Sequence, residues 1–527
     1  MPDLSVPTTT PPRSGLAARA RSLVGERGTP RRALASNGAW NVATMLAGAV
    51  AVFGLRPFVV ASLGDALFGV WSIVAAMTSY MGSGVADLGV RPAIVHFVAK
   101  HDALGDADAV NRYVNTAFVV FAATGTAVLL LTGLAVPLLP RLFDIAPDAI
   151  GDARWALGLS GLDIALAMPL NAYSAVLVGK QRFVLLNQVN LLVLVGKSAA
   201  IVALLSAGHG IVALALVNLA GSVLEMGAKS FAAFRIEPRL RFAPGLARRD
   251  AAKELLKYGG LAVIVSLSLV LVWQTDAIVI GAMISVPAVT WFANGSCLPA
   301  KARDLTVAAG RVLEPAAGAL DATGDVAAIR RMIGNGAKTL LLLAGPMLCY
   351  FVVVGDAFLA RWFGESHRPV SGHVLAILAL GAAGPIASYP FVSVMYGANR
   401  MKTLAILAIV EGTVNLGLSL VLARSHGVVG VALGTAIPAA VFHGLLIPHY
   451  VGRPYGIRLA PFLLVTWAKP LAASVATVFV LRALAPAGAR FGWLELAGIA
   501  AAAAATFYAT YALLARITSR GDAEVSA

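Results

Sequence analysis

The chain repeats itself at a distance of about 220 residues, and this repeat constrains the fold more than any other feature. RPFVVASLGDALFGVW, from Arg56 to Trp71, aligns with DAIVIGAMISVPAVTW, from Asp276 to Trp291, so that the two Trp residues coincide and Arg56 stands opposite Asp276. Three further matches keep the same order: the segments that begin at Asp87, Asp102 and His209 return at Asp304, Asp321 and His426. Collinear matches of this kind, two of them polar, indicate two copies of one structural unit.

The composition places these copies in a membrane. Hydrophobic residues make up 59% of the 527 residues and charged residues only 13%, whereas a soluble chain has about 25% charged residues. The net charge of +15 comes from basic residues in loops between apolar segments, so it does not indicate nucleic-acid binding. Cys297 and Cys349 both lie in apolar segments, which predicts small core residues and neither a disulfide framework nor a metal site.

About fourteen segments are apolar over the roughly 20 residues that a membrane span requires. The first six run roughly through 38–61, 66–88, 114–137, 153–178, 184–206 and 210–234. The next six run roughly through 258–283, 287–309, 338–360, 372–396, 402–424 and 428–450, and a final pair, about 465–485 and 492–515, lies outside the repeat. We therefore predict an all-α polytopic membrane protein. Because each copy holds an even number of spans, both enter the membrane in the same direction, which predicts two parallel, pseudo-symmetric six-helix lobes plus a C-terminal helix pair.

Basic residues set the expected orientation, since cytoplasmic loops carry an excess of Lys and Arg. The first 35 residues, the linker after span six and the segment after span eight are rich in both, while loops 62–65 and 283–286 have neither. Both termini are therefore expected in the cytoplasm. The resulting division is a disordered basic tail (1–35), an N-lobe (36–235), a basic cytoplasmic linker (236–257), a C-lobe (258–451), the additional helix pair (452–516) and a cytoplasmic tail (517–527).

Ionisable residues deep in spans cost roughly 2.5–3.5 kcal/mol each, so they usually face a bundle interior or a wet cavity. Arg56 cannot lose its charge and must meet an anion or water. Its position in the outer half of span one leaves three roles open: reaching the interface at Ser62, pairing with Asp276, or lining a cavity that receives an anionic group.

Three other deep residues complete the candidate site. Asp163 and Lys197 lie at similar depth in adjacent spans, either as a buried ion pair or as a cavity cation and its counter-ion or proton site. Glu411 has no basic residue within two turns of its own helix, and an apolar span favours the neutral form of an acid. We predict Arg56, Lys197 and Asp276 as substrate-binding cavity residues, and Asp163 and Glu411 as coupling carboxylates.

Two stretches resemble a known family. LGDALFGVW after span one and ADLGVRPAIVHFVAK closing span two resemble the opening hairpin of bacterial polysaccharide-transport proteins. The stretch from Met395 to Pro438, with its Gly-Ala-Asn-Arg turn and its Gly-Val-Val-Gly-Val-Ala segment, resembles the lipid-linked oligosaccharide flippases of the multidrug/oligosaccharidyl-lipid/polysaccharide (MOP) exporter superfamily. The resemblance extends over about 38–450.

This resemblance implies a function. The family implies two six-helix lobes around a central cavity, alternating access, and export of an undecaprenyl-pyrophosphate-linked glycan across the bacterial inner membrane. It implies membrane lipids and the glycan as partners, together with a glycan polymerase or export machinery, but no nucleic acid. Two alternatives stay open: a cation-coupled multidrug exporter of the same superfamily, and a peptidoglycan-precursor (lipid II) flippase, which the extra helix pair brings to mind. An enzyme is not expected, because no phosphate loop, metal-ligand cluster or nucleophile arrangement occurs in the sequence. We expect no cofactor beyond proton or sodium coupling.

Overall fold

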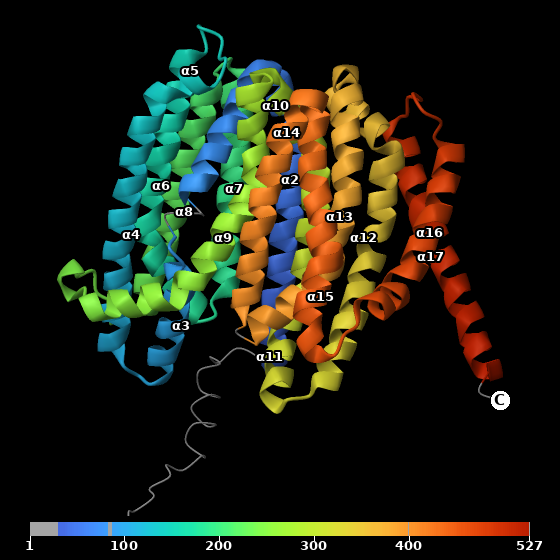
Figure 1. Cartoon of the computed structure of the whole chain (residues 1–527). Helices are drawn as coiled ribbons and strands as arrows, with labels where there is room; N and C mark the ends of the chain where they lie inside the picture. The colour runs from blue at the N-terminus through green and yellow to red at the C-terminus, as the bar shows by residue number, and fades with distance from the viewer. Residues whose placement is uncertain (1–29, 83–86, 399, 526–527) are drawn as a thin grey trace, which may run out of the picture.

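The computed structural model describes residues 30–82, 87–398 and 400–525, and its regular elements are all helices (Figure 1). In the first part of the chain these are α2 (Pro30–Ser79), α3 (Val90–Ala103), α4 (Ala107–Ala135), α5 (Leu139–Leu142), α6 (Ile150–Gly179), α7 (Phe183–Ser206) and α8 (Ile211–Ile236). The remainder forms α9 (Arg249–Met283), α10 (Val286–Gly310), α11 (Leu313–Thr323), α12 (Val326–Phe363), α13 (Arg368–Gly397), α14 (Met401–Val441), α15 (Ile447–Gly452), α16 (Leu459–Leu484) and α17 (Trp493–Val525).

Two of the longest helices reverse direction at a glycine. In α2 the backbone of Gly64 is non-helical, with φ of 71° and ψ of 169°. The Arg56 guanidinium lies 5.4 Å from the ring centroid of Phe68, whereas twelve residues of straight helix would separate them by about 18 Å. In α14 the same happens at Gly427, with φ of 56° and ψ of −136°. Each of these helices therefore contains two spans joined by a tight turn.

The span count follows from these turns. Among the described residues, 11 helices are long and apolar enough to cross a membrane, and α2 and α14, with their reversals, account for two spans each. The 25-residue α10 crosses the bundle beside them (Figure 1). A helix thus occupies each of the fourteen predicted spans, and the prediction of an all-α polytopic membrane protein is confirmed.

The repeated sequences adopt the same local structure in both copies. Asp106 is the N-cap of α4, and its Oδ1 accepts a hydrogen bond of 2.9 Å from the backbone N–H of Ala109. Asp325 is the N-cap of α12, and its Oδ1 accepts one of 2.8 Å from the N–H of Ala328. Such N-caps satisfy donors that a helix leaves free, so the matched polar segments end one helix and start the next at equivalent places.

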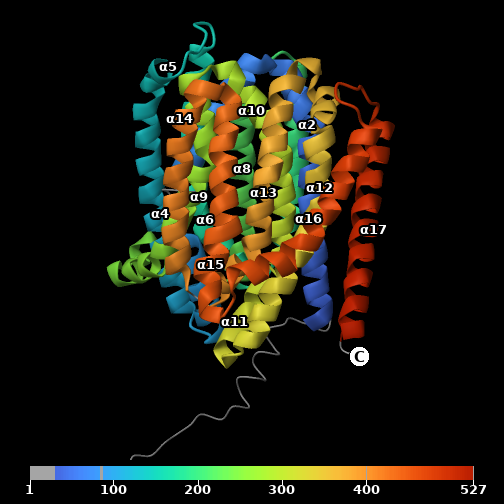
Figure 2. The same cartoon turned by 45° about the vertical axis from the view of Figure 1, so that its right-hand side comes forward.

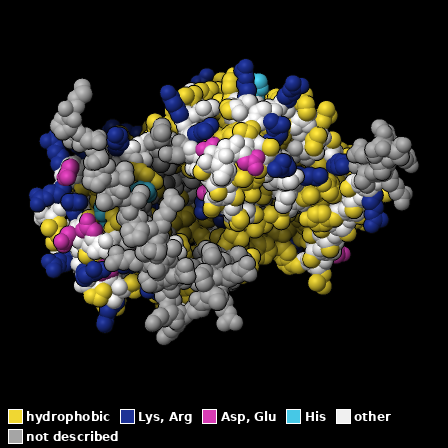
Figure 3. All heavy atoms as spheres, turned by 90° about the horizontal axis from the view of Figure 1, so that it is seen from below, with side chains coloured by type: hydrophobic (Ala, Val, Ile, Leu, Met, Phe, Trp, Pro, Cys, Tyr) yellow, Lys and Arg dark blue, Asp and Glu magenta, His cyan; other side chains and the backbone are white. Residues whose placement is uncertain are grey.

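The two copies run in the same direction. The described chain begins and ends at the lower end of the bundle in Figures 1 and 2, and both the first part of α2 and α9 rise from that end. Seen from below, Lys and Arg side chains gather around the rim of this lower face (Figure 3). This arrangement is the parallel one, and an inverted second copy would have started at the opposite end.

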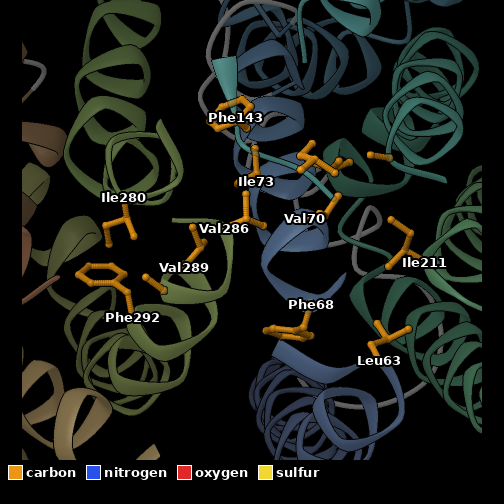
Figure 4. Close-up of a cluster of buried hydrophobic side chains, with 14 of the residues drawn as sticks. Leu63, Phe68, Val70, Ile73, Phe143, Ile211, Ile280, Val286, Val289 and Phe292 are labelled. Atoms are coloured by element: carbon orange, nitrogen blue, oxygen red, sulfur yellow. The ribbon is translucent and has the colours of Figure 1, made fainter. Parts of the chain in front are cut away.

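The core has separate clusters in each half and one that joins them. A cluster of buried apolar side chains from α3, α4, α6 and the start of α9 fills the first half, and two others fill the second. The joining cluster lies at the upper end, where Val286 and Val289 of α10 pack beside Val70 and Ile73 of α2 (Figure 4). This cluster holds the halves together at the end of the bundle where the Gly64 turn lies, and a close backbone contact between Gly89 and Gly259 brings α9 against the first half near the other end.

The last two helices pack on the outside of the second half. Leu481 of α16 and Phe507 of α17 are fully buried in the cluster formed with α12. A Cβ on Gly345 would lie 2.3 Å from the Phe507 ring, so this glycine makes room for α17. Figure 2 shows both helices at the edge of the bundle. The ring of Trp493, the first residue of α17, also lies 5.9 Å from the ring of Phe53 in α2, so this helix touches the first half.

Candidate transport cavities

Arg56 and Lys197, which are 141 residues apart in the sequence, line one cavity in the first half. The cavity has a volume of about 520 Å³ and is bounded by α2, α7 and α8. Its polar lining is Arg56, Lys197, Glu225, Asn190, Asn218, Thr44 and Ser198, and the remaining wall is apolar and includes the rings of Phe68 and Trp71. We call it the cationic cavity, since two positive side chains face one carboxylate there.

Arg56 is held by the other half of the molecule. Its Nε donates a hydrogen bond of 3.1 Å to Asn294 Oδ1, and its Nη2 donates one of 2.8 Å to the carbonyl of Ala293, both on α10. Its guanidinium also lies over the Phe68 ring, in a cation–π contact. These contacts orient the planar group at the wall of the cationic cavity. They also show that residues of α10, rather than Asp276, are the partners of Arg56 in the second half.

Asp276 lies elsewhere, in a second cavity of about 180 Å³ in the second half. It is 3% exposed, and its carboxylate accepts a hydrogen bond from the Thr435 hydroxyl, with distances of 3.0 and 2.9 Å to its two oxygens. Asn415 in turn donates to Thr435 Oγ1 at 3.1 Å. The same cavity is lined by Arg303, whose guanidinium stacks 3.7 Å above the Trp273 ring. The structure therefore does not pair Arg56 with Asp276, and it places the predicted binding residues in two cavities.

Asp163 and Lys197 are near enough to interact electrostatically. Asp163 Oδ2 accepts a hydrogen bond of 3.3 Å from Ser222, while its buried Oδ1 has no hydrogen-bond partner in the described part of the chain. The stem of Lys197 packs on Gly221, where a Cβ would lie 2.4 Å from its Cδ. Asp163 therefore keeps one oxygen without a hydrogen-bond partner in the described part of the chain, near Lys197 of the cationic cavity.

Glu411 has a basic partner that its own helix could not supply. Its Oε2 lies 3.3 Å from Nε2 of His443, and Nδ1 of that histidine lies 2.7 Å from Ser388 Oγ. His443 belongs to the π-helical segment Phe442–Leu446, which follows α14. Glu411 is 5% exposed, whereas the His443 side chain is 19% exposed, so the carboxylate is buried and the imidazole is partly buried. Reasoning along one helix missed His443, and the only sequence signal was a titratable residue in the neighbouring span.

Asp65 was also missed, although it directly follows the Gly64 turn. The Thr290 hydroxyl donates to its backbone carbonyl at 2.6 Å, and Trp291 Nε1 donates to its carboxylate at 3.1 Å. His367 Nε2 lies 3.5 Å from the other carboxylate oxygen. These contacts close the upper end across the two halves. The sequence signal that could have identified Asp65 is its position as an acidic residue next to a turn between two spans.

The chain is similar in sequence to proteins of polysaccharide transport and biosynthesis. The model of the family described as "Polysaccharide biosynthesis protein" matches residues 63–372. The "Uncharacterized membrane protein EpsK" of Bacillus subtilis (strain 168) is 21% identical over 416 residues, covering 78% of this chain and 81% of that protein. The "Putative O-antigen transporter" of Shigella flexneri is 20% identical over 410 residues, covering 76% and 94%.

Solved structures share the fold. A lipid II flippase, MurJ, in an inward closed conformation superposes with a TM-score of 0.67 at 13% identity, covering 91% of this chain and 99% of that one. An inward-facing multidrug resistance transporter of the MATE family, in the MOP superfamily, gives a TM-score of 0.61 at 14% identity, covering 84% and 98%. The predicted resemblance to the MOP superfamily is confirmed at the level of the fold.

Proposed function

Because the chain belongs to the family of polysaccharide biosynthesis proteins, we propose that it is a flippase for an oligosaccharide linked to undecaprenyl pyrophosphate. It moves this lipid from the inner to the outer leaflet of the bacterial cytoplasmic membrane, with both of its termini in the cytoplasm. The coarser statement, a membrane transporter of the MOP type, already follows from the family and the fold. The cargo is our proposal.

The observation that carries it is the convergence of Arg56 and Lys197 on one cavity. A pyrophosphate needs cations along its path, and the planar fork of Arg matches two phosphate oxygens, whereas Lys acts as a point charge. An inside-negative potential favours outward movement of an anion by about 2.3 kcal/mol per charge per 100 mV. Asn190 and Asn218 add amide donors and acceptors suited to sugar hydroxyls.

Alternating access is supported by how the halves meet. The cluster that joins them and the contacts of Asp65 both lie at the upper end. A cargo in this state would enter from the lower end, where the basic residues gather (Figure 3). Release requires the upper contacts to break and the lower ends, which already meet at Gly89 and Gly259, to close further. Asp163 and Glu411 are the proposed coupling carboxylates, for a proton or a sodium ion, and a glycan polymerase or export machinery would take the product.

The test is transport by the purified protein in liposomes that contain an undecaprenyl-pyrophosphate-linked oligosaccharide. A membrane-impermeant glycosidase reports the glycan that reaches the outer face. We expect the protein to accelerate its appearance, and Lys197→Ala to slow it. Lys469→Ala, in α16 and away from both cavities, is the matched control. No acceleration, with the protein correctly inserted, would contradict the proposal.

Asp276 favours one second candidate. A buried carboxylate in a cavity that already holds the Arg303 cation over the Trp273 ring is suited to an organic cation that replaces this guanidinium. Liposomes loaded with ethidium decide this point, since a multidrug exporter would move the dye and leave the glycan lipid in place. Liposomes with lipid II separate the other alternative, because a peptidoglycan-precursor flippase would prefer that lipid.

A further inference from the structure

An apolar groove runs along the seam between α2 and α7. Its volume is about 900 Å³, larger than that of the cationic cavity. Val50, Gly54 and Phe58 line it from α2, and Val195, Ala199 and Val202 line it from α7. No ionisable side chain is among the described residues that line it, and Val50 and Val195 are 71% and 60% exposed. In a bilayer such a surface faces hydrocarbon.

The groove and the cationic cavity are separated by a single layer of side chains. Ala51, Leu55, Leu194 and Ser198 line both spaces, so these four residues form the wall between them. Arg56 follows Leu55 in α2, and Lys197 precedes Ser198 in α7. The two cations of the cavity are therefore next to the wall, on the side away from the apolar groove.

Two unpartnered polar atoms mark the cavity side of the same seam. Thr44 Oγ1 on α2 and Asn190 Oδ1 on α7 are buried side-chain oxygens without a hydrogen-bond partner in the described part of the chain. Both residues line the cationic cavity. Buried polar groups normally have partners, so this side of the seam is built to receive a polar ligand, while the other side is built for an apolar one.

We propose that the groove holds the isoprenoid chain of a polyprenyl pyrophosphate while its pyrophosphate lies against Arg56 and Lys197, the molecule passing through the wall between α2 and α7. This inference rests on the proposed function and adds the path of the lipid tail. Each CH₂ transferred from hydrocarbon to water costs about 0.8 kcal/mol, so a long tail cannot follow its headgroup into a wet cavity. It must stay in the bilayer, and the protein must open beside the headgroup.

The wall suits such an opening. Ala51 and Ser198 are small, and Leu55 and Leu194 can change rotamer without losing a hydrogen bond or a charge partner. A tail that threads between them connects the bilayer to the cations through the wall that both spaces share. The tail then slides along the groove from one leaflet to the other, while the headgroup crosses inside the cavity.

The first test uses the unmodified full chain in nanodiscs. A polyprenyl pyrophosphate with a benzophenone at its tail is photo-cross-linked to the protein, and the labelled peptides are identified by mass spectrometry. We expect label on residues 47–58 and 191–203, displaced by unlabelled polyprenyl pyrophosphate. Label confined to other helices would overturn the inference. So would equal labelling of the groove by a benzophenone phosphatidylglycerol that the polyprenyl pyrophosphate cannot displace, because the groove would then hold ordinary bilayer lipid.

The second test fills the groove. A Cβ on Gly54 would meet open space, and so would one on Gly133 of α4, which is exposed far from the groove in sequence and element. Gly54→Leu should reduce both tail labelling and glycan transport about tenfold, equivalent to about 1.4 kcal/mol, and Gly133→Leu should leave both unchanged. If Gly54→Leu behaves like Gly133→Leu while the wild type still transports the glycan lipid, the tail path is wrong and the proposed function stands. If the wild type neither binds nor transports the glycan lipid, both the tail path and the proposed function are contradicted.

Discussion

Trp291 Nε1 on α10 donates a hydrogen bond of 3.1 Å to the carboxylate of Asp65, the residue after the Gly64 turn of α2. The two residues belong to different copies of the repeat and meet at the upper end of the bundle, where the joining apolar cluster also lies. Any state that opens at this end has to break this hydrogen bond. In the proposed alternating-access cycle, Asp65 would therefore influence the balance between the two states.

The first prediction concerns this contact. Trp291→Phe removes the donor and keeps an aromatic ring. A hydrogen bond to a charged group contributes about 1.5–3 kcal/mol, so the equilibrium should shift towards the state open at the upper end by about tenfold or more. Spin labels at Asp148 and Ser425, both at the upper end, should report a larger population of long distances. Trp155→Phe, at a side chain that is 66% exposed, should change nothing. Equal distance distributions in both variants would show that the contact does not hold this end closed.

The second prediction concerns Arg56. If its guanidinium binds the pyrophosphate, Arg56→Ala should lower glycan export by at least about 100-fold, because hydrogen bonds to charged groups contribute about 1.5–3 kcal/mol each. Arg56→Lys should recover only part, since Lys lacks the planar fork. Asp276→Asn should not rescue Arg56→Ala, because the two side chains have separate partners. Export is measured as surface glycan in a complementation assay, with protein in the membrane quantified.

Asn294 supplies the control for Arg56. It accepts a hydrogen bond from Arg56 Nε, so Asn294→Ala removes a structural partner and leaves the cation. We expect Asn294→Ala to retain most export. An Asn294→Ala loss as severe as that of Arg56→Ala would mean that Arg56 acts as a tie to α10. Restored export in the double variant Arg56→Ala with Asp276→Asn would falsify the anchor role.

The third prediction concerns coupling. Glu411 is buried with His443 3.3 Å away, and Asp163 has one unpartnered oxygen in the described part of the chain. If a proton moves through these groups, Glu411→Gln and Asp163→Asn should flatten the pH dependence of transport, and His443→Gln should resemble Glu411→Gln. Initial transport rates between about pH 5.5 and 8.5 test this. Glu495→Gln, at an exposed carboxylate in the first turn of α17, should keep the wild-type profile. Wild-type profiles in all three variants would leave these residues a structural role only.

The fourth prediction concerns the lower end, outside the spans. Lys180 Nζ lies 2.7 Å from Asp102 and 2.6 Å from Glu237, and Arg239 lies 3.0 Å from Glu237. Burial raises the pKa of Glu237, but the hydrogen bonds from Lys180 and Arg239 outweigh it and leave that pKa below its ordinary value. Burial lowers the pKa of Lys180, and its two carboxylate partners more than offset this, so that pKa is raised.

The directions of these two pKa shifts define the pH range in which the ion pairs stabilise the folded protein. A depressed carboxyl pKa stabilises the folded state above the unfolded value, about 4.3, and this contribution is lost as pH falls through the folded pKa. The raised pKa of Lys180 stabilises below about 10.4 and is lost only as pH rises through its folded value. Glu237→Gln should therefore lower the free energy of unfolding by about 1–3 kcal/mol at pH 7. The difference from wild type should shrink below about pH 4. Thermal unfolding in detergent measures it, with the exposed Asp304→Asn as a control expected to cost about 0–1 kcal/mol. A difference that is constant across this range would contradict the linkage.

Much of the fold could be read from the chain because the membrane imposes it. Spans of about 20 apolar residues must be helical, since lipid offers no partner for backbone groups. The repeat placed Asp106 and Asp325 at equivalent helix starts, and the structure shows the same cap at both. The deep charges also stood out, because burying them is costly in any fold. Helices, repeat and the residues worth testing were thus decided by the sequence alone.

The partners of those residues were decided only by the tertiary structure. Alignment of the repeats set Arg56 opposite Asp276. In the structure, the rotation and depth of α10 place Ala293 and Asn294 against the Arg56 guanidinium, and Asp276 is hydrogen-bonded to Thr435 instead. The basic partner of Glu411 is His443, which lies on a different helical segment. Sequence spacing determines which residues share a face of one helix. It does not determine which face meets another helix, because side-chain packing between distant segments sets that angle and register.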